Sequence, residues 1–172
     1  MPASPDLDGP HWRFPVGLYR RPGVQDACLA LQEALGLDVV LLMAALHAAT
    51  ARGAPDRRAI AAAFASVRTW REGSVLPLRE ARRRLKGLAS AVPADLRDGL
   101  RNRIKALELE AEQVELAVLA ADFASRPAGA LAQDAAALAG VVRDVIAAQG
   151  LDAASAAADG PVRTIADAIT GT

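Results

Sequence analysis

The sequence predicts an all-α fold, a helical bundle of six to seven helices with no sheet, and three observations support this prediction. Alanine and leucine, both strong helix formers, account for 41 and 22 of the 172 residues. Aromatic residues, which favour strands, make up only 3% of the chain. Apolar residues recur at spacings of three and four along most of the sequence. With 52% hydrophobic residues, the chain can bury a core without disulfides or a metal.

The first part of the chain is predicted to form a flexible leader over residues 1–10, a short aromatic helix or turn over 12–19, and a helix from Pro22 to Gly36. Proline suits the first turn of a helix, and glycine suits the left-handed residue that ends it. The next helix, residues 39–51, is apolar nearly all round. We therefore expect it to be the central buried helix.

The remaining elements follow in order: helices over 55–72 and 75–92 with a break or kink at Gly73 and Ser74, the longest helix over 93–125, an alanine-rich helix over 128–148, a linker over 150–160 and a short helix over 161–170. We divide the chain into the leader at 1–10, a helical core domain at 11–126 and an extension at 127–172. The extension is expected to pack on the core or to be partly mobile.

The formal net charge is zero, but the charges are unevenly distributed. Residues 1–51 carry 3 basic and 5 acidic groups, residues 52–105 carry 14 and 5, and residues 106–172 carry 3 and 10. The three segments therefore have net charges of −2, +9 and −7. The basic middle and the acidic C-terminal third either neutralise each other within one molecule or attract a charged partner.

One helix face in the basic segment collects four cationic side chains within an arc of about 100°. They are Arg79, Arg82, Arg83 and Lys86. Such a face can bind phosphate, nucleic acid or an acidic partner. The alternative is internal pairing with carboxylates of the longest helix, which are Glu108, Glu110, Glu112, Glu115 and Asp122. Near this face only Phe64 and Trp70 offer stacking rings, and both fit a core stripe better, so nucleic acid is a weakly supported partner.

The longest helix carries apolar side chains on two sides. One side is an a/d seam of nearly three heptads: Ile104, Leu107, Ala111, Val114, Val118 and Ala121. The other side carries Leu109, Leu116, Leu119 and Phe123. Such a helix either lies inside the bundle or meets a partner chain, in a homodimer or a heteromer. The residues expected at such an interface are Leu107, Leu109, Val114, Leu116, Val118 and Phe123.

The sequence offers little for catalysis. Its histidines are His11 and His47, and its one cysteine, Cys28, falls on a core stripe, which predicts a buried thiol. There is no C-x-x-C, H-E-x-x-H, Walker or G-x-G-x-x-G motif, so we expect neither a metal nor a cofactor. Asp38 is best explained as a helix N-cap, and the alternative is a buried carboxylate that faces Arg79.

Nothing in the sequence predicts export or membrane insertion. The N-terminus lacks the basic and apolar regions of a signal peptide. The longest uncharged apolar stretch, residues 39–51, is shorter than the roughly 20 residues that span a bilayer. We therefore expect a cytoplasmic protein without a membrane partner.

Three stretches of the sequence form a specific combination. The first holds Trp12, Phe14 and Tyr19, then Pro22-Gly23-Val24, Ala27-Cys28-Leu29, Leu31-Gln32, Gly36, Asp38-Val39 and Leu41-Leu42. The second is Trp70 followed by Val-x-Pro-Leu-Arg-x-x-Arg-Arg over 75–83, and the third is Lys-Ala-Leu-Glu-Leu-Glu-Ala-Glu over 105–112. Over about residues 12–116 the chain resembles a bacterial family of small helical proteins of unknown function. It departs from that pattern at Val40, where we expect Asn, and near His47, where we expect Trp.

These observations favour a non-catalytic interaction or adaptor protein that self-associates or binds a protein partner. The first alternative is anion or nucleic-acid binding through the basic helix face. The second is a small-ligand protein or an enzyme, with a pocket near Asp38, His47 and Arg79. Candidate binding residues are Arg79, Arg82, Arg83, Lys86, Trp70, Tyr19, Asp38 and His47.

Overall fold

The computed structural model describes residues 7–88 and 92–171, and all regular secondary structure in them is helical. The helices are α1 (Pro10–Tyr19), α2 (Val24–Leu35), α3 (Val39–Ala51), α4 (Arg57–Trp70), the π-helical turn η1 (Arg71–Val75), α5 (Leu76–Lys86), α6 (Ala94–Ser125), α7 (Ala135–Ala148) and α8 (Ala156–Thr170). The predicted all-α bundle is confirmed. The first six residues of the expected leader lie outside the described residues.

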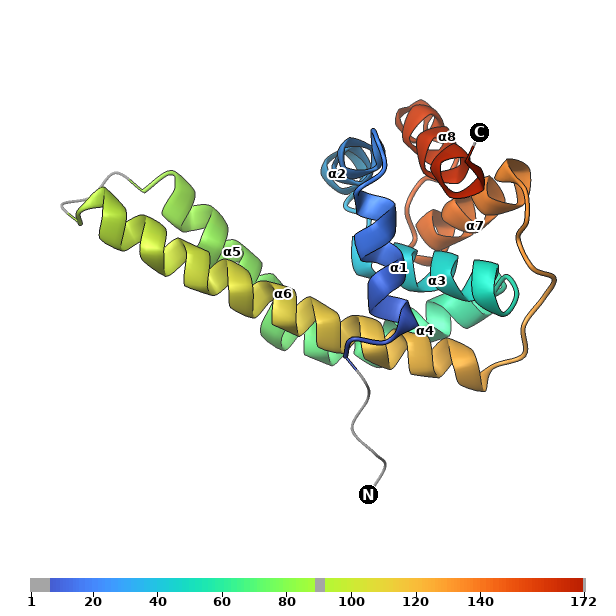
Figure 1. Ribbon diagram of the computed structural model, residues 1–172, viewed down its shortest axis with the longest axis horizontal. Helices are drawn as coiled ribbons and strands as arrows, with labels where there is room; N and C mark the ends of the chain where they lie inside the picture. The colour runs from blue at the N-terminus through green and yellow to red at the C-terminus, as the bar shows by residue number, and fades with distance from the viewer. Residues whose placement is uncertain (1–6, 89–91, 172) are drawn as a thin grey trace, which may run out of the picture.

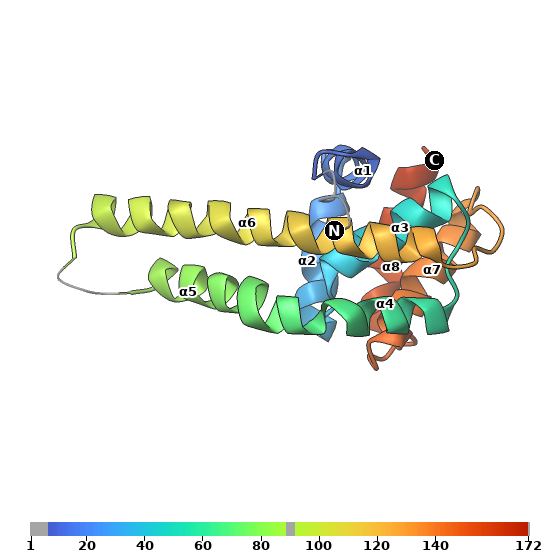
Figure 2. The ribbon, with the colours of Figure 1, turned by 90° about the horizontal axis from the view of Figure 1, so that it is seen from below.

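Figure 1 and Figure 2 show a helical body from which one long hairpin projects. The hairpin consists of α5 and the first half of α6, described over residues 76–88 and 92–107, and is called the arm below. The second half of α6 continues into the body, where it packs against α3 and α4. None of the described helices combines the length and the apolar character that a membrane crossing requires.

Helix α3 is the centre of the body, as its uninterrupted apolar sequence predicts. Leu41, Leu42 and Leu46 are completely buried, and α1, α6 and α7 surround the helix. Asp38 caps its N-terminus, because its carboxylate accepts a hydrogen bond from the Leu41 backbone N–H at 3.0 Å. The expected N-cap is therefore confirmed.

The helix predicted to break or kink at Gly73 and Ser74 instead continues without interruption from α4 into α5. One turn of π-helix, η1, accommodates this stretch, so α4, η1 and α5 follow one another directly. Pro77 follows directly after this turn, near the start of α5. The π-helical turn also places Arg71 toward the body, which matters for the site described below.

The C-terminal extension packs on the body through α7 and α8. Helix α8 lies against α2 and α7, and Leu138, Ile146 and Ile165 are completely buried in the shared core. Two boundaries differ from the sequence prediction. Helix α7 begins only at Ala135, because Asp134 caps it there, and α8 begins at Ala156, inside the expected linker.

Two loops that join these parts run side by side. The Ala54 N–H donates to the Ala130 carbonyl at 2.8 Å, and the Gly129 N–H donates to the Ala54 carbonyl at 3.1 Å. Gly53 has a φ of +135°, and a Cβ there would lie 2.2 Å from the Gly129 carbonyl oxygen. The close approach of the loops therefore requires glycine at position 53.

Candidate functional site: an ionic network and a cleft at the base of the arm

Helix α6 turns a row of carboxylates toward the rest of the molecule. Glu108, Glu112 and Glu115 follow at helical spacing, and Leu119, which is completely buried, continues the same face. Glu108 and Glu115 are themselves buried, at 5% and 0% exposure. Buried carboxylates require compensating charge or protonation, so their partners decide the chemistry of this region.

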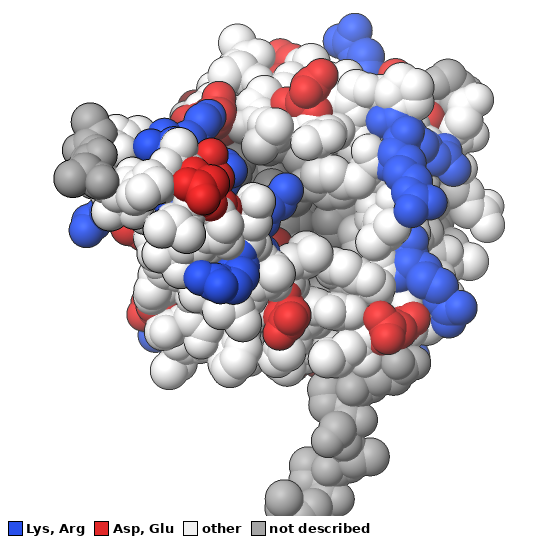
Figure 3. Space-filling view, turned by 60° about the vertical axis from the view of Figure 1, so that its left-hand side comes forward, with Lys and Arg blue, Asp and Glu red and all other residues white. Residues whose placement is uncertain are grey.

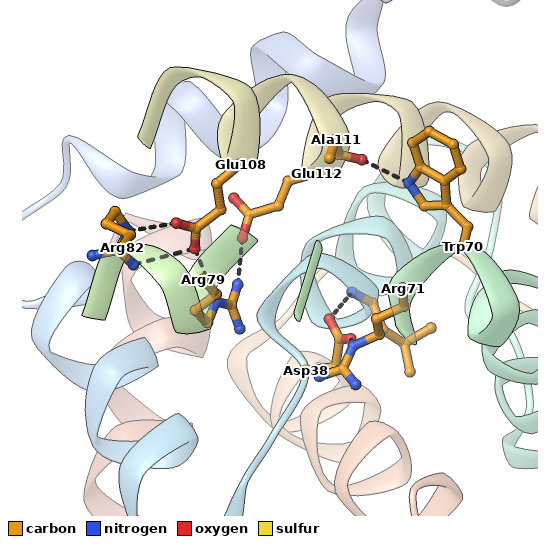
Figure 4. Close-up of polar contacts among 9 residues, drawn as sticks. Asp38, Trp70, Arg71, Arg79, Arg82, Glu108, Ala111 and Glu112 are labelled. Atoms are coloured by element: carbon orange, nitrogen blue, oxygen red, sulfur yellow. Dashed lines mark hydrogen bonds and ion pairs between the residues drawn. The ribbon is translucent and has the colours of Figure 1, made fainter. Parts of the chain in front are cut away.

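The partners of the first two carboxylates are arginines of α5. Arg79 Nε lies 3.0 Å from Glu108 Oε1, and its Nη2 pairs with Glu112. Arg82 donates to the Glu108 carboxylate through both Nε and Nη2, and the Nη2 lies 3.2 Å from Oε1 (Figure 4). The basic face of α5 is thus neutralised in part within the chain, as one of the two sequence interpretations expected.

Burial and ion pairing act in opposite directions on these carboxylates. Burial alone would raise the pKa of Glu108, but hydrogen bonds from Arg82 and Arg79 lower that pKa below its usual value. The pKa of Glu112 is raised, because its burial outweighs its attraction to Arg79. Glu108 is therefore the firmly ionised anchor that holds both arginines.

A second ion pair lies deeper, between Asp38 and Arg71. Asp38 is 3% exposed, and its Oδ2 pairs with Arg71 Nε, as the close-up in Figure 4 shows. The Asp38 backbone N–H donates to Gln149 Oε1 at 2.9 Å, which ties the start of α3 to the end of α7. Asp38 is thus also a buried carboxylate that faces a cation, as in the alternative interpretation, but that cation is Arg71, which η1 places next to it, and not Arg79.

Glu115 has no such partner among the described residues. Both carboxylate oxygens are buried without a hydrogen bond. Burial, followed by the nearby charge of Asp38, raises the pKa of Glu115 to about 8. Glu115 is therefore mostly protonated at neutral pH. We call the group Asp38, Arg71, Arg79, Arg82, Glu108, Glu112 and Glu115 the ionic network.

Next to the ionic network, at the base of the arm, lies an open cleft of about 540 Å³. Helices α1, α2, α3, α5 and α6 line it, and Figure 3 shows the surface hollowed between the arm and the body. Its walls are Trp12, Pro15, Val16, Tyr19, Gln25, Leu29, Gln32, Val39, Val40, Met43, Arg79, Arg82, Lys105, Glu108, Leu109, Glu112 and Leu116. The cleft thus combines an apolar wall with one charged end.

The a/d seam of α6 flanks the carboxylate row and is partly open: Ala111 in its middle is buried, and Ile104 lies in a groove against α5. Leu107 is 51% exposed, Val118 is also exposed, and Val114 is half-buried. Leu96 and Leu100 extend the same face toward the tip of the arm, and both are exposed. We call Leu96, Leu100, Ile104, Leu107, Val114 and Val118 the seam. Of the expected interface residues, Leu116 and Phe123 are buried in the chain's own core, so a partner cannot reach them, and Leu109 faces the cleft.

The structure brings together only some of the expected binding residues. Tyr19, Arg79 and Arg82 line the cleft, whereas Arg83 and Lys86 are exposed on the arm outside it. Trp70 is half-exposed, and its indole N–H donates to the Ala111 carbonyl at 3.0 Å, on the seam side of α6.

The pocket expected around Asp38 and His47 does not include either residue. The His47 ring packs against Phe14, with ring centroids 5.6 Å apart, and burial lowers its pKa. Cys28 is buried beside Tyr19, and burial raises the pKa of this thiol to about 11, which makes it a poor nucleophile. In the described parts of the chain, no group of three or more His, Cys, Asp or Glu side chains is placed to hold a metal ion.

Sequence reasoning missed Arg71 and Lys105 as site residues and did not identify Glu115 as a buried acid. One signal was available for Glu115. Glu108, Glu115 and Leu119 share one helical face, so burial of Leu119 implies burial of the glutamates. Nothing in the sequence indicated that α1 and α2 would close a cleft over Lys105.

A family model described as "Protein of unknown function (DUF2390)" matches residues 10–119. The match contains every residue of the ionic network and of the cleft wall, and it ends before α7. No curated protein and no solved structure matches the chain.

Proposed function

This chain belongs to a family of unknown function (DUF2390), so its function has to be inferred from the site itself. We propose that the protein is a non-catalytic binding protein whose arm docks an acidic amphipathic helix of a partner protein. The observation that carries this proposal is the row of exposed apolar side chains along the seam of α6, Leu96, Leu100, Leu107 and Val118. It presents apolar side chains at helical spacing over residues 96–118, a length of about 33 Å at 1.5 Å per residue. Helix-in-groove recognition uses apolar anchors at this spacing.

The arm concentrates the exposed apolar surface of the described residues. Half of their ten exposed large apolar side chains lie on it: Leu88, Val92, Leu96, Leu100 and Leu107. A shallow groove of about 550 Å³ runs between α5 and α6, with Leu85, Leu100 and Ile104 among its walls. Apolar patches of this kind mark interaction sites more often than ordinary surface.

The charge of the arm selects among the possible partners. Residues 76–107 carry nine basic and three acidic side chains, a net charge of +6. Two arms of this charge repel each other, which disfavours self-association through the seam. Nucleic acid would match the charge but would leave the exposed leucines uncovered. A protein helix with one apolar face and flanking carboxylates satisfies both requirements.

Anion binding through the basic face of α5 is less well supported. Arg79 and Arg82 are already paired with Glu108 and Glu112, so only Arg83 and Lys86 are left to contact an external anion. Two exposed cations on one helical turn are typical of an ordinary solvated surface. The protein-partner function is therefore the one that the geometry favours.

The proposal is tested by a photo-crosslinking amino acid placed at Leu100, with Leu131 as the control. Both positions are exposed leucines, at 42% and 46%, but Leu131 lies in the loop before α7, outside the arm. In cells of the native host, Leu100 is expected to give a discrete adduct with another protein, and Leu131 is not. Mass spectrometry of the adduct should identify a helix with an apolar face and net negative charge.

A further substitution makes the test specific. Leu96→Glu places a charge in the seam one helical turn from Leu100 and is expected to abolish the adduct. Equal adducts from both positions, an adduct only with a second copy of this chain, or no adduct at all would each overturn the proposal.

A further inference from the structure

The cleft at the base of the arm is separate from the seam. Leu109 lines the cleft, whereas Leu107, two residues earlier on α6, does not. The volume of about 540 Å³ falls within the range of about 300–1,000 Å³ that small-molecule sites occupy. The cleft therefore has the size for a small molecule, and the partner helix proposed for the seam would not fill it.

The apolar wall of the cleft contains side chains that the protein does not cover itself. Leu29 and Leu109 are 44% and 49% exposed, and both face the cleft. Trp12 and Tyr19 contribute aromatic surface from α1, and Met43 contributes a flexible side chain from α3. Apolar surface left open in a concave site is stabilised when an apolar ligand displaces the water.

The cleft wall also carries charged side chains, with an excess of positive groups. Arg79, Arg82 and Lys105 line it together with Glu108 and Glu112. Glu108 holds both arginines at fixed positions, so they are preorganised at the cleft wall. Lys105 lies one helical turn before Glu108, is exposed, and forms no ion pair with any described residue. An incoming anion therefore finds a cation that is not already neutralised.

We propose that this cleft binds an amphipathic organic anion, with its apolar body against Leu29, Leu109 and Trp12. Its carboxylate or phosphate group lies at Lys105, with Arg82 beside it. Glu108 and Glu112 repel a second negative charge, so the ligand carries a single anionic head. This assignment does not depend on the partner proposed for the seam, because it rests on different side chains.

The ligand class is tested with four probes of the same chain length: decanoate, decyl phosphate, decan-1-ol and decylammonium. Isothermal titration calorimetry with the full-length protein measures their dissociation constants below their critical micelle concentrations. Decanoate or decyl phosphate is expected to bind at least about tenfold more tightly than the alcohol, since charge-assisted contacts exceed neutral ones. Decylammonium is expected to bind more weakly still. Equal binding of all four probes, or tightest binding of decylammonium, would overturn the assignment.

The chain offers two matched pairs of variants for locating the bound anion. Leu109→Gln is expected to weaken decanoate binding about tenfold through lost apolar contact, and Leu107→Gln, at an equally exposed position outside the cleft, is expected to leave it unchanged. Lys105→Gln is expected to weaken it about fivefold, whereas Lys86→Gln changes nothing. All four side chains are exposed to solvent, so the variants are expected to fold. Loss of binding in the control variants, or no loss in the cleft variants, contradicts the proposed site.

Discussion

Replacing Glu115 with Gln is expected to abolish most of the loss of stability that the native protein undergoes as the pH rises from 5 to 8. Glu115 is completely buried, and its pKa is raised from 4.5 to about 8. The folded protein therefore keeps a proton on Glu115 that the unfolded chain releases above pH 4.5. Its contribution to stability is complete below pH 4.5 and is lost as the pH rises through 8. The loss is about 1.4 kcal/mol per pH unit, or on the order of 3 kcal/mol over this interval.

Urea unfolding of the native protein and of Glu115→Gln at pH 5, 6.5 and 8 measures this difference. The two proteins should have similar free energies of unfolding at pH 5, and the variant should be clearly more stable at pH 8. Glu110→Gln is the control, because Glu110 is an exposed glutamate of the same helix and should leave the pH profile unchanged. Parallel pH profiles for the native protein and Glu115→Gln would show that Glu115 is ionised when folded.

Replacing Arg71 with Met is expected to destabilise the protein by about 3–5 kcal/mol, because the buried Asp38 carboxylate loses its cation. Glu115 lies close enough for its pKa to respond to both Asp38 and Arg71. As an acid it cannot replace the positive charge that Asp38 loses. The methionine side chain preserves much of the buried volume of the arginine stem. The loss therefore reports on charge more than on packing.

The double variant Asp38→Asn/Arg71→Met separates these contributions. Asn at position 38 keeps a side-chain oxygen that caps α3, and it needs no counter-charge. Thermal and urea unfolding should therefore show the double variant to be at least about 1–2 kcal/mol more stable than Arg71→Met alone. A loss below about 1 kcal/mol in Arg71→Met would show that the ion pair is not needed to hold α3 against η1.

The sequence predicted those elements whose signals are local. The N-cap at Asp38 and the end of α2 at Gly36 depend on a few neighbouring residues, and the structure has both. Helix α6 also ends at Ser125, before Pro127, as expected. At Gly73 and Ser74, where a break or kink was expected, the helix is not broken but passes through the π-helical turn η1, which contacts α6, and α5 begins directly after it at Leu76.

The orientation of α6 could not be predicted from its own sequence. Two of its faces are apolar, and the face that becomes buried also carries Glu108, Glu112 and Glu115. Hydrophobic patterning favours the seam as the buried side, since it is the more regular apolar repeat. Charge compensation from α5 reverses that preference, because Arg79 and Arg82 make the carboxylate face the one that packs. The seam is left open as a consequence.

The cleft was beyond prediction for a related reason. Lys105 and Leu109 belong to a surface that exists only because α1 and α2 pack across the base of the arm. Residues from five helices meet there, and no spacing within the sequence indicates that they converge. Trp12 and Tyr19, from the short aromatic helix or turn that the sequence predicts, line the cleft. The position of the cleft along α6 was not predicted.

The central claim is that the seam of α6 is the docking surface for a protein partner. The most direct test compares two variants, each of which changes a leucine on a different face of that helix. The measurement is the yield of the partner adduct from the crosslinker at Leu100, in chains that carry Leu107→Gln or Leu109→Gln. These leucines are almost equally exposed, but Leu107 lies in the seam and Leu109 in the cleft. Leu107→Gln is expected to lower the yield at least about fivefold, and Leu109→Gln is expected to leave it unchanged. An unchanged yield in Leu107→Gln, or a loss confined to Leu109→Gln, would contradict the claim.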